Sequence, residues 1–266
     1  MNIGIVGGMG AVGHANKKGF EHVGHTIKIH DTKIKTSLED LLDCDVIFIC
    51  VPTPSKEDGS CDTSSVEYTI EYLTNHFNYR GIIAIRSTVE PGFTQEMIDT
   101  YKNPRICFVP EFLHERKAEE DFINNHKLLA IGTTNDYNKR PVIRAHGDLP
   151  ENTIIMSPTE AELLKYYNNV FASLRVTFSN VFYEVCKKLD ADYDKIKNAY
   201  IKTGKATDMY MDVNENMRGY GGMCLPKDTK ALQKLIEKLG FNYDIIKSID
   251  KDNSKFKTTV FKGMRE

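Results

Sequence analysis

The sequence lacks a marked excess of charge of either sign. Its 266 residues carry 35 lysines and arginines against 37 aspartates and glutamates, a formal net charge of −2. Proteins dedicated to nucleic-acid binding usually present a basic surface, so we expect no nucleic-acid partner. The sequence also lacks a run of about 18 apolar residues, and its first residues, MNIGIVGG, do not resemble a signal peptide. We therefore expect no membrane partner and a cytoplasmic protein.

The cysteines lack the close spacings of metal sites and disulfide scaffolds. No CxxC or CxxH pattern occurs among the six cysteines, so a zinc site is disfavoured and we expect no metal. A chain of this length can bury roughly 70–75% of its unfolded surface, so neither a metal nor a disulfide is needed for stability. Each cysteine must then be judged by its own surroundings.

What the sequence does contain is a repeated alternation of short apolar runs with helical patterns. The predicted strands are Asn2–Val6, Thr26–His30, Asp45–Val51, Ile82–Arg86, Ile106–Val109, Lys127–Ile131 and Asn152–Met156. The predicted helices between them are Gly10–His22, Ser37–Leu42, Ser64–His76 and Gly92–Tyr101. Uninterrupted apolar strands are typical of buried parallel sheets. The order predicts the α/β class, with an N-terminal Rossmann-type doubly wound sheet.

The pattern changes at Ser157, which begins a capping box with Pro158 and Glu160. Apolar residues then recur at spacings of three and four as far as Leu189, which predicts one helix of about 30 residues followed by mostly helical sequence. We place a domain boundary here. It separates residues 1–156, the predicted Rossmann domain, from residues 157–266, a long central helix with a small helical domain.

A glycine-rich turn joins the first predicted strand to the first predicted helix. Gly8, Gly10 and Gly13 stand in GxGxxG register, which allows a pyrophosphate to approach backbone N–H groups at the helix N-terminus. Asp31 stands at the end of the second predicted strand, 18 residues after Gly13, and could accept hydrogen bonds from an adenosine ribose. The pattern predicts NAD as the cofactor, with Met9 and Val12 also in contact. A glycine turn without a ligand is the alternative.

The segment GYGGMCLPKDT, residues 219–229, contains the cysteine with the most informative surroundings. Pro226 suits the first turn of a helix, so Cys224 would stand just before the helix N-terminus. There the helix dipole and Lys227 favour a thiolate, although Asp228 nearby opposes it. We therefore predict that Cys224 is a nucleophile. An inert buried thiol is the expectation for Cys44, Cys50, Cys107 and Cys186.

This segment resembles the signature of the UDP-glucose/GDP-mannose dehydrogenase family. Five further segments match the family in order, and the resemblance covers essentially the whole chain: GGMGAVG at 7–13, VPTP at 51–54, STVEPGF at 87–93, PEFLHE at 110–115 and AELLKYYNNVFASLR at 161–175. The resemblance implies an NAD-dependent, four-electron oxidation of the C6 alcohol of a nucleotide sugar, with a UDP-glucose-like sugar as the first choice. The product that the resemblance implies is a uronate for polysaccharide biosynthesis, which would form through a cysteine thiohemiacetal and thioester.

The resemblance also assigns roles to individual residues. Cys224 would capture the aldehyde, while Lys165 and Asn169, four apart on the long helix, would stabilise alkoxide charge. Thr88 and Asp228 would orient and deprotonate water, and Glu111 would lie near the sugar. Further expected cofactor contacts are Thr53, Thr88, Glu115 and Lys227. Expected substrate contacts are Glu111, Phe112, Leu113, Glu115, Lys165, Arg218 and Gly221.

Three alternatives stay open. Two-electron relatives, such as the 3-hydroxyisobutyrate dehydrogenases, carry a lysine and an asparagine three apart, which Lys165 and Asn168 would also fit; those relatives do not use the cysteine. Glu111 and Glu115 could instead form a solvated acidic helix face. Finally, the segment after Asp31 is short and a typical family member continues into a further domain, so the chain could be a cofactor-binding remnant that needs a partner chain.

Two further expectations concern the helical part. Residues 208–218 correspond to a family loop that contacts substrate, and Arg218 replaces the usual aromatic residue there, so it could pair with a diphosphate. The methionines of this loop are more typical of packing. Family members pair through the long central helix, and Phe171, Phe178 and Phe182 make this helix apolar on more than one face. We therefore predict a homodimer.

Overall fold

The computed structural model describes residues 1–256, apart from the side chain of Glu115, and divides into two compact units. The first unit contains residues 1–54 and 61–165. The second contains residues 55–60 and the chain from residue 166 onward. Each unit is described by itself.

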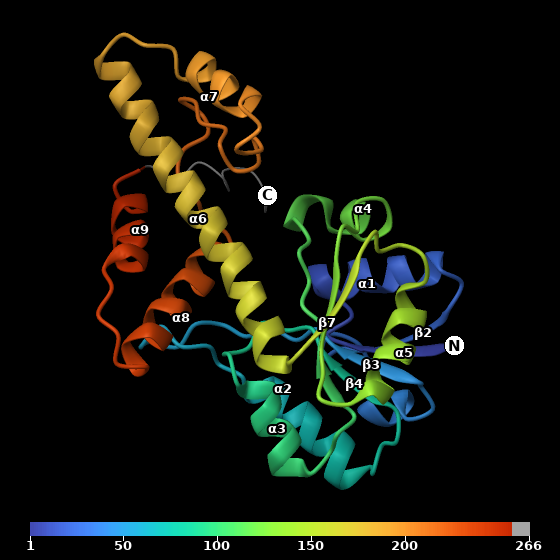
Figure 1. The fold of residues 1–266 in the computed structure, drawn as a ribbon. Coiled ribbons are helices and arrows are strands. Elements are labelled where there is room, and N and C mark those ends of the chain that lie inside the picture. Colours follow the sequence, from blue (N-terminus) through green and yellow to red (C-terminus); the bar gives the residue numbers. More distant parts are fainter. Residues whose placement is uncertain (257–266) are drawn as a thin grey trace. The chain divides into compact units, whose positions relative to one another are not determined.

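The first unit is built on one seven-stranded sheet (Figure 1), which confirms the predicted α/β class. Its strands are β1 (Asn2–Val6), β2 (Thr26–His30), β3 (Val46–Ile49), β4 (Ile82–Ile85), β5 (Ile106–Phe108), β6 (Leu129–Gly132) and β7 (Thr153–Met156). Their order is β2-β1-β3-β4-β5-β6-β7, and every neighbouring pair is parallel except β5 and β6. The carboxyl ends of β1, β3 and β4 therefore lie at one edge.

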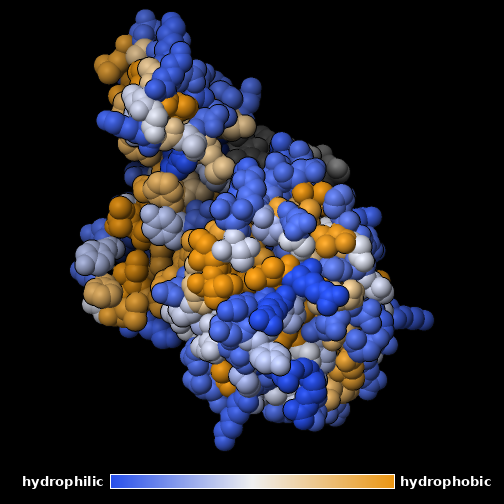
Figure 2. Space-filling model, turned by 45° about the vertical axis from the view of Figure 1, so that its right-hand side comes forward, coloured by the Kyte–Doolittle hydropathy of each residue, from blue (hydrophilic) through white to orange (hydrophobic). Residues whose placement is uncertain are grey.

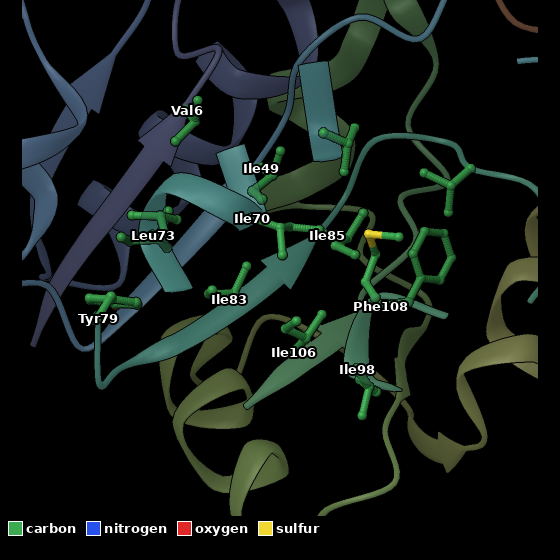
Figure 3. Close-up of a cluster of buried hydrophobic side chains, with 14 of the residues drawn as sticks. Val6, Ile49, Ile70, Leu73, Tyr79, Ile83, Ile85, Ile98, Ile106 and Phe108 are labelled. Carbon is green, nitrogen blue, oxygen red and sulfur yellow. The ribbon is translucent and has the colours of Figure 1, made fainter. Parts of the chain in front are cut away.

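Helices cover both faces of this sheet. They are α1 (Ala11–His22), η1 (Leu38–Leu41), α2 (Ser64–Glu71), η2 (Tyr72–His76), α3 (Phe93–Tyr101), η3 (Glu115–Lys117), α4 (Ala118–Ile123) and α5 (Asp136–His146). One apolar cluster joins alternate strand residues such as Ile49, Ile83 and Ile85 to Ile70 of α2 and Ile98 of α3 (Figure 3).

The opposite face of the sheet has a cluster of its own. Phe48, Ala84 and Cys107 of the strands pack there with Phe20 of α1 and Val142 of α5. All four residues of β3 are buried, because the sheet is covered on both faces.

The second unit is helical. The long helix α6 (Pro158–Lys188) has 31 residues, starts in the first unit and continues into the second (Figure 1). At its start, the Ser157 N–H donates to the Glu160 carboxylate at 2.7 Å and the Glu160 N–H to the Ser157 hydroxyl at 3.3 Å, as the predicted capping box requires. The remaining helices are α7 (Tyr193–Lys202), α8 (Leu225–Lys238) and α9 (Ile245–Asn253).

Several apolar side chains of α6 are exposed. They are Leu163, Tyr167, Phe171, Phe178, Val181, Phe182 and Val185. Hydrophobic residues also reach the surface elsewhere among mainly hydrophilic neighbours (Figure 2). In residues 1–256, no helix combines the length and the apolar character that crossing a membrane would take.

Candidate functional site

The turn between β1 and α1 has the geometry that the glycine pattern predicts. Gly7 has a φ of +83°, and a Cβ added at Gly13 would lie 2.2 Å from the Gly7 carbonyl oxygen. Glycine is therefore required at both positions. Gly10, which has no side chain that could cap the helix, is the N-cap of α1, and the described first turn of α1 contains no acidic residue. The N–H groups of Gly7, Gly8, Met9 and Gly10 are used in bonds within the protein, so the N–H groups that suit an anion such as a pyrophosphate are those of the first turn of α1.

Asp31, at the end of β2, closes this turn. It is buried, and its carboxylate accepts hydrogen bonds from the N–H groups of Met9 at 2.9 Å and Lys33 at 3.0 Å. Each carboxylate oxygen has a second lone pair that a ribose hydroxyl can use. The residues present thus fit the adenosine and pyrophosphate parts of NAD. The bond from Asp31 to Met9 was not expected from the sequence.

The loops after β3 and β4 meet at the same edge of the sheet. The buried Thr53 hydroxyl donates to the Thr88 carbonyl oxygen at 2.7 Å, so two of the expected cofactor contacts are linked directly. Glu162 of α6 holds the segment that follows Thr88. Its carboxylate accepts the N–H groups of Gly92 at 2.6 Å and Thr94 at 2.8 Å. Burial, partly opposed by these bonds, raises the pKa of Glu162. Sequence reasoning missed this residue, although it lies within a segment that resembles the family.

Glu111 and Lys165 form a buried ion pair. The Lys165 ammonium donates to the Glu111 carboxylate at 2.8 Å and to the Glu111 carbonyl oxygen at 2.5 Å, and the Leu113 N–H donates to the carboxylate at 2.7 Å. Burial by itself raises the pKa of Glu111, but the Lys165 charge and these hydrogen bonds outweigh it and hold that pKa below its usual value. The Lys165 nitrogen also lies 5.8 Å from the centre of the Phe112 ring.

The alternative of a solvated acidic helix face is wrong for Glu111. This residue is buried in the extended segment after β5, before η3 begins. Glu115 is the first residue of η3, and its side chain lies outside the described part of the structure, so its expected contacts stay predictions.

Cys224 is the N-cap of α8, where the sequence places it. It is the exposed member of the six cysteines, while Cys61 is only 3% exposed. The Cys224 carbonyl accepts the Asp228 N–H at 2.9 Å, so the first turn of α8 is regular. The thiol therefore stands where the partial positive charge of a helix N-terminus acts on it.

Asp228, in the first turn of α8, is fully buried, and its carboxylate accepts hydrogen bonds from two side chains. Lys227 donates to one carboxylate oxygen at 2.5 Å and Asn169 to the other at 2.6 Å. Asn169 is buried, whereas Asn168 is exposed and donates to the Asn169 side-chain oxygen at 2.9 Å. Of these two asparagines, the buried one that contacts Asp228 is Asn169, which is the residue that the four-electron assignment uses.

Arg218 lies in a separate network of the second unit. Its guanidinium pairs with Glu184, donates to the Asn180 side-chain oxygen at 2.8 Å and lies 5.0 Å from the centre of the Tyr183 ring. A diphosphate at Arg218 would have to compete with Glu184, and the expected pairing stays a prediction. Gly221 is half-buried in the loop between Arg218 and Cys224. Within residues 1–256, no three histidine, cysteine, aspartate or glutamate side chains are grouped as metal ligands.

Several known proteins are similar to this chain. A UDP-glucose 6-dehydrogenase of Rickettsia typhi is 29% identical over 221 residues, which cover 80% of this chain and 50% of that protein. One of Rickettsia prowazekii is 30% identical over 216 residues, and one of Pseudomonas aeruginosa is 28% identical over 246 residues; these cover 79% and 86% of this chain and 49% and 52% of those proteins. The chain spans about half the length of the relatives it matches.

Solved structures share the fold. A UDP-glucose dehydrogenase of Pyrobaculum islandicum superposes with a TM-score of 0.86 at 24% identity, over 96% of this chain and 68% of that one. A 3-hydroxyisobutyrate dehydrogenase of Mycobacterium tuberculosis superposes with a TM-score of 0.75 at 12% identity, over 96% of this chain and 92% of that one. At such identities the likeness shows the fold alone.

Two family models decide the classification. Residues 21–146 match the NAD-binding domain of the UDP-glucose/GDP-mannose dehydrogenase family, and residues 159–255 match its central domain. The first match contains Asp31, Thr88 and Glu111, and the second contains Lys165 and Cys224. The chain belongs to the UDP-glucose/GDP-mannose dehydrogenase family.

Proposed function

We propose that this chain catalyses the NAD-dependent oxidation of the C6 alcohol of a nucleotide sugar to a uronate, with UDP-glucose-like sugars as the substrate class. The family and the named relatives support this class of reaction. The observation that carries the proposal is Cys224, an exposed thiol at the N-terminus of α8, in a chain whose other five cysteines are buried. A two-electron dehydrogenase has no use for such a thiol.

The first unit supplies the cofactor-binding residues. Gly8, Gly10 and Gly13, with Met9 and Val12 of the same turn, would hold the pyrophosphate, and Asp31 would hold the ribose. When bound, NAD would accept one hydride at each of two oxidations. Thr53, Thr88, Glu115 and Lys227 are the further contacts that we propose.

In the proposed first oxidation, the alcohol loses its hydroxyl proton and a hydride from C6 and becomes an aldehyde. Lys165 and Asn169 stabilise the negative charge that develops on the C6 oxygen. The Lys165 ammonium is already fixed by Glu111, so its direction is set before the substrate binds. Glu111, Phe112, Leu113, Gly221 and Arg218 are the other substrate contacts that we propose.

Cys224 then retains the aldehyde for the second oxidation. Its sulfur bonds to the aldehyde carbon and the oxygen takes up a proton, which gives a thiohemiacetal; loss of a hydride and the hydroxyl proton gives a thioester. Water, oriented by Thr88 and deprotonated by Asp228, attacks the carbonyl carbon, and the carbon–sulfur bond breaks to restore the thiol. In sum, one alcohol, one water and two NAD⁺ give one carboxylate, two NADH and three protons.

The stoichiometry of NADH tests this proposal. UDP-glucose, GDP-mannose and their analogues are offered to the wild type, to Cys224→Ser and to the matched control Cys186→Ser, which changes a buried thiol. We expect two NADH per sugar from the wild type and the control, and a loss or a stall at the first oxidation in Cys224→Ser. Full turnover by Cys224→Ser would overturn the assigned nucleophile.

The alternatives give other results in the same experiment. One NADH per turnover with a hydroxyacid, independent of Cys224, would indicate a two-electron dehydrogenase. Binding of NAD in calorimetry without binding of any UDP- or GDP-sugar, alone or with candidate partner chains, would indicate a cofactor-binding remnant.

We also propose a homodimer formed through α6. The exposed side chains Phe171 (48%), Phe178 (58%) and Phe182 (38%) give this helix an apolar surface that association would cover. A mass of two chains in light scattering is expected, and Phe178→Glu should lower it to one. A monomer mass for the wild type at all concentrations would contradict the proposal.

A further inference from the structure

The loop that precedes Cys224 is fastened at Tyr220 by a side chain far away in the sequence. The Tyr220 N–H donates to the Asn253 side-chain oxygen at 2.8 Å, and the Asn253 side-chain NH₂ donates to the Tyr220 carbonyl at 2.9 Å. One amide of α9 thus satisfies both backbone polar groups of a residue whose side chain is 3% exposed. This two-point contact fixes the position and the direction of the chain at Tyr220.

Packing and a second asparagine support the same point. The Tyr220 ring lies in an apolar cluster with Val170 of α6 and Ile249 of α9, one helical turn before Asn253. On the other side, the Gly219 N–H donates to the side-chain oxygen of Asn180 at 3.1 Å. The start of the loop is therefore held by α6 and α9 together.

After Tyr220 the backbone has more conformational freedom. Gly221 and Gly222 follow, and Gly222 has a φ of +86°. Glycines do not restrict the backbone by themselves. Since the glycines leave this stretch free to move and Cys224 comes only four residues after Tyr220, the contacts at Tyr220 limit the positions that the chain can take before α8 begins.

We propose that Asn253 is a positioning residue for Cys224, acting through the backbone of Tyr220. It touches none of the proposed reacting atoms. Its effect is to keep the thiol at the end of α8, where the helix N-terminus favours the thiolate. The consequence for turnover rests on the proposed function, whereas the effect on the loop and the thiol does not.

The test uses the full chain with three substitutions. Asn253→Ala removes both contacts with Tyr220. Asn253→Asp keeps an acceptor for the Tyr220 N–H but loses the donor to its carbonyl. Asn242→Ala removes an exposed asparagine from the connection between α8 and α9 and is the matched control.

Hydrogen exchange reads the contact directly. In Asn253→Ala we expect the Tyr220 amide to exchange about tenfold faster or more, the factor that corresponds to one lost buried hydrogen bond. Amides of α6 should keep their wild-type rates, and Asn253→Asp should lie between wild type and Asn253→Ala. If Asn253→Ala does not fold, Asn253→Asp decides the question. An unchanged Tyr220 amide, or a rise shared equally by all amides, would overturn the proposal.

Two functional readouts separate positioning from mere stabilisation. The pH profile of Cys224 alkylation by iodoacetamide should move to higher pH in Asn253→Ala, since the thiol leaves the helix end. The kcat for nucleotide-sugar oxidation should fall about tenfold while the Kd for NAD stays within about twofold. Faster exchange of the Tyr220 amide with an unchanged alkylation profile would show that Asn253 stabilises the loop but does not position Cys224. A wild type without dehydrogenase activity would refute the proposed function only, because exchange and alkylation would still decide the role of Asn253.

Discussion

At the scale of single residues, the exposure of Cys224 predicts selective chemistry. Iodoacetamide near neutral pH should label Cys224 first, and saturating nucleotide sugar should slow the reaction. Cys61 is the internal control, because its side chain is 3% exposed. Mass spectrometry of the labelled peptides makes the measurement. Preferential labelling of Cys61, without protection of Cys224 by substrate, would show that Cys224 is not activated.

The buried pair of Glu111 and Lys165 predicts a large asymmetry between single and double substitutions. Lys165→Met should lower the free energy of unfolding by about 3–5 kcal/mol, since the Glu111 carboxylate stays buried without its cation. Lys165→Met combined with Glu111→Leu should recover much of this loss. Urea unfolding followed by circular dichroism measures both. Equal losses in the single and double variants would mean that the pair is not coupled.

The same pair makes a prediction for acid. The folded-state pKa of Glu111 is below its usual value of 4.5, so its contribution to stability is complete above that value and is lost as the pH falls through the folded-state pKa. The stability difference between wild type and Glu111→Gln should therefore shrink below about pH 4.5. A difference that is constant with pH would contradict the ionised state of Glu111.

The sequence allows some residues of the candidate site to be predicted, but not the residues that hold the site's backbone in place. Cys224 and its helix could be predicted, because Pro226 and the spacing to Asp228 are local signals. Glu162 and Asn253 could not, since each acts on a backbone group far away in the sequence, 70 and 33 residues from its own position. No local pattern distinguishes such an acceptor from an ordinary polar residue of a helix.

At the scale of elements, the turn before α1 predicts different effects for two glycines. Gly13→Ala should destabilise the first unit by about 1–3 kcal/mol, because its Cβ would meet the Gly7 carbonyl oxygen at 2.2 Å. Gly10→Ala is the matched control, with its nearest contact at 3.4 Å. It should preserve the unfolding temperature but weaken NAD binding. Calorimetry and thermal unfolding separate the two effects. Equal unfolding temperatures for both variants would contradict the steric argument.

The elements show what apolar patterns can and cannot predict. The strands were placed within a few residues, since buried runs such as Val46–Ile49 are unambiguous. The antiparallel pairing of β5 with β6 could not be predicted from these apolar runs, because a buried strand has the same apolar pattern in a parallel and in an antiparallel pair. Helix α5 was missed; Pro141 lies inside it, and burial of Val142 and Ala145 keeps it helical despite the proline.

At the scale of the whole molecule, the buried His146 and the half-buried His126 predict a loss of stability in mild acid. Burial, with the nearby Arg86 charge acting in the same direction, lowers the pKa of His126 to about 4 and that of His146 well below 6.5. Arg86 donates to the His146 ring at 2.6 Å, so His146 is held neutral. Between about pH 6.5 and 4 the unfolded chain binds protons that the folded chain does not. The free energy of unfolding therefore decreases as the pH is lowered through this range.

The expected slope is up to about 1.4 kcal/mol per pH unit for each histidine within this window. His126→Phe should flatten the dependence of the unfolding free energy on pH, whereas the exposed His76→Gln should leave it as in the wild type. Denaturant unfolding at a series of pH values tests this. Identical slopes for His126→Phe and the wild type would show that His126 titrates normally in the folded state.

The bond between Asp31 and the Met9 amide has a consequence for the thermodynamics of binding. Because this carboxylate already holds the glycine turn, the conformational entropy of the turn is lost when the chain folds and not when a dinucleotide arrives. The ligand meets a preorganised surface. With the ribose contact that we propose, Asp31 would therefore contribute twice to affinity, as an acceptor for the ribose and by restricting the free protein. Its loss should appear in calorimetry as a less favourable entropy of association in addition to a weaker enthalpy.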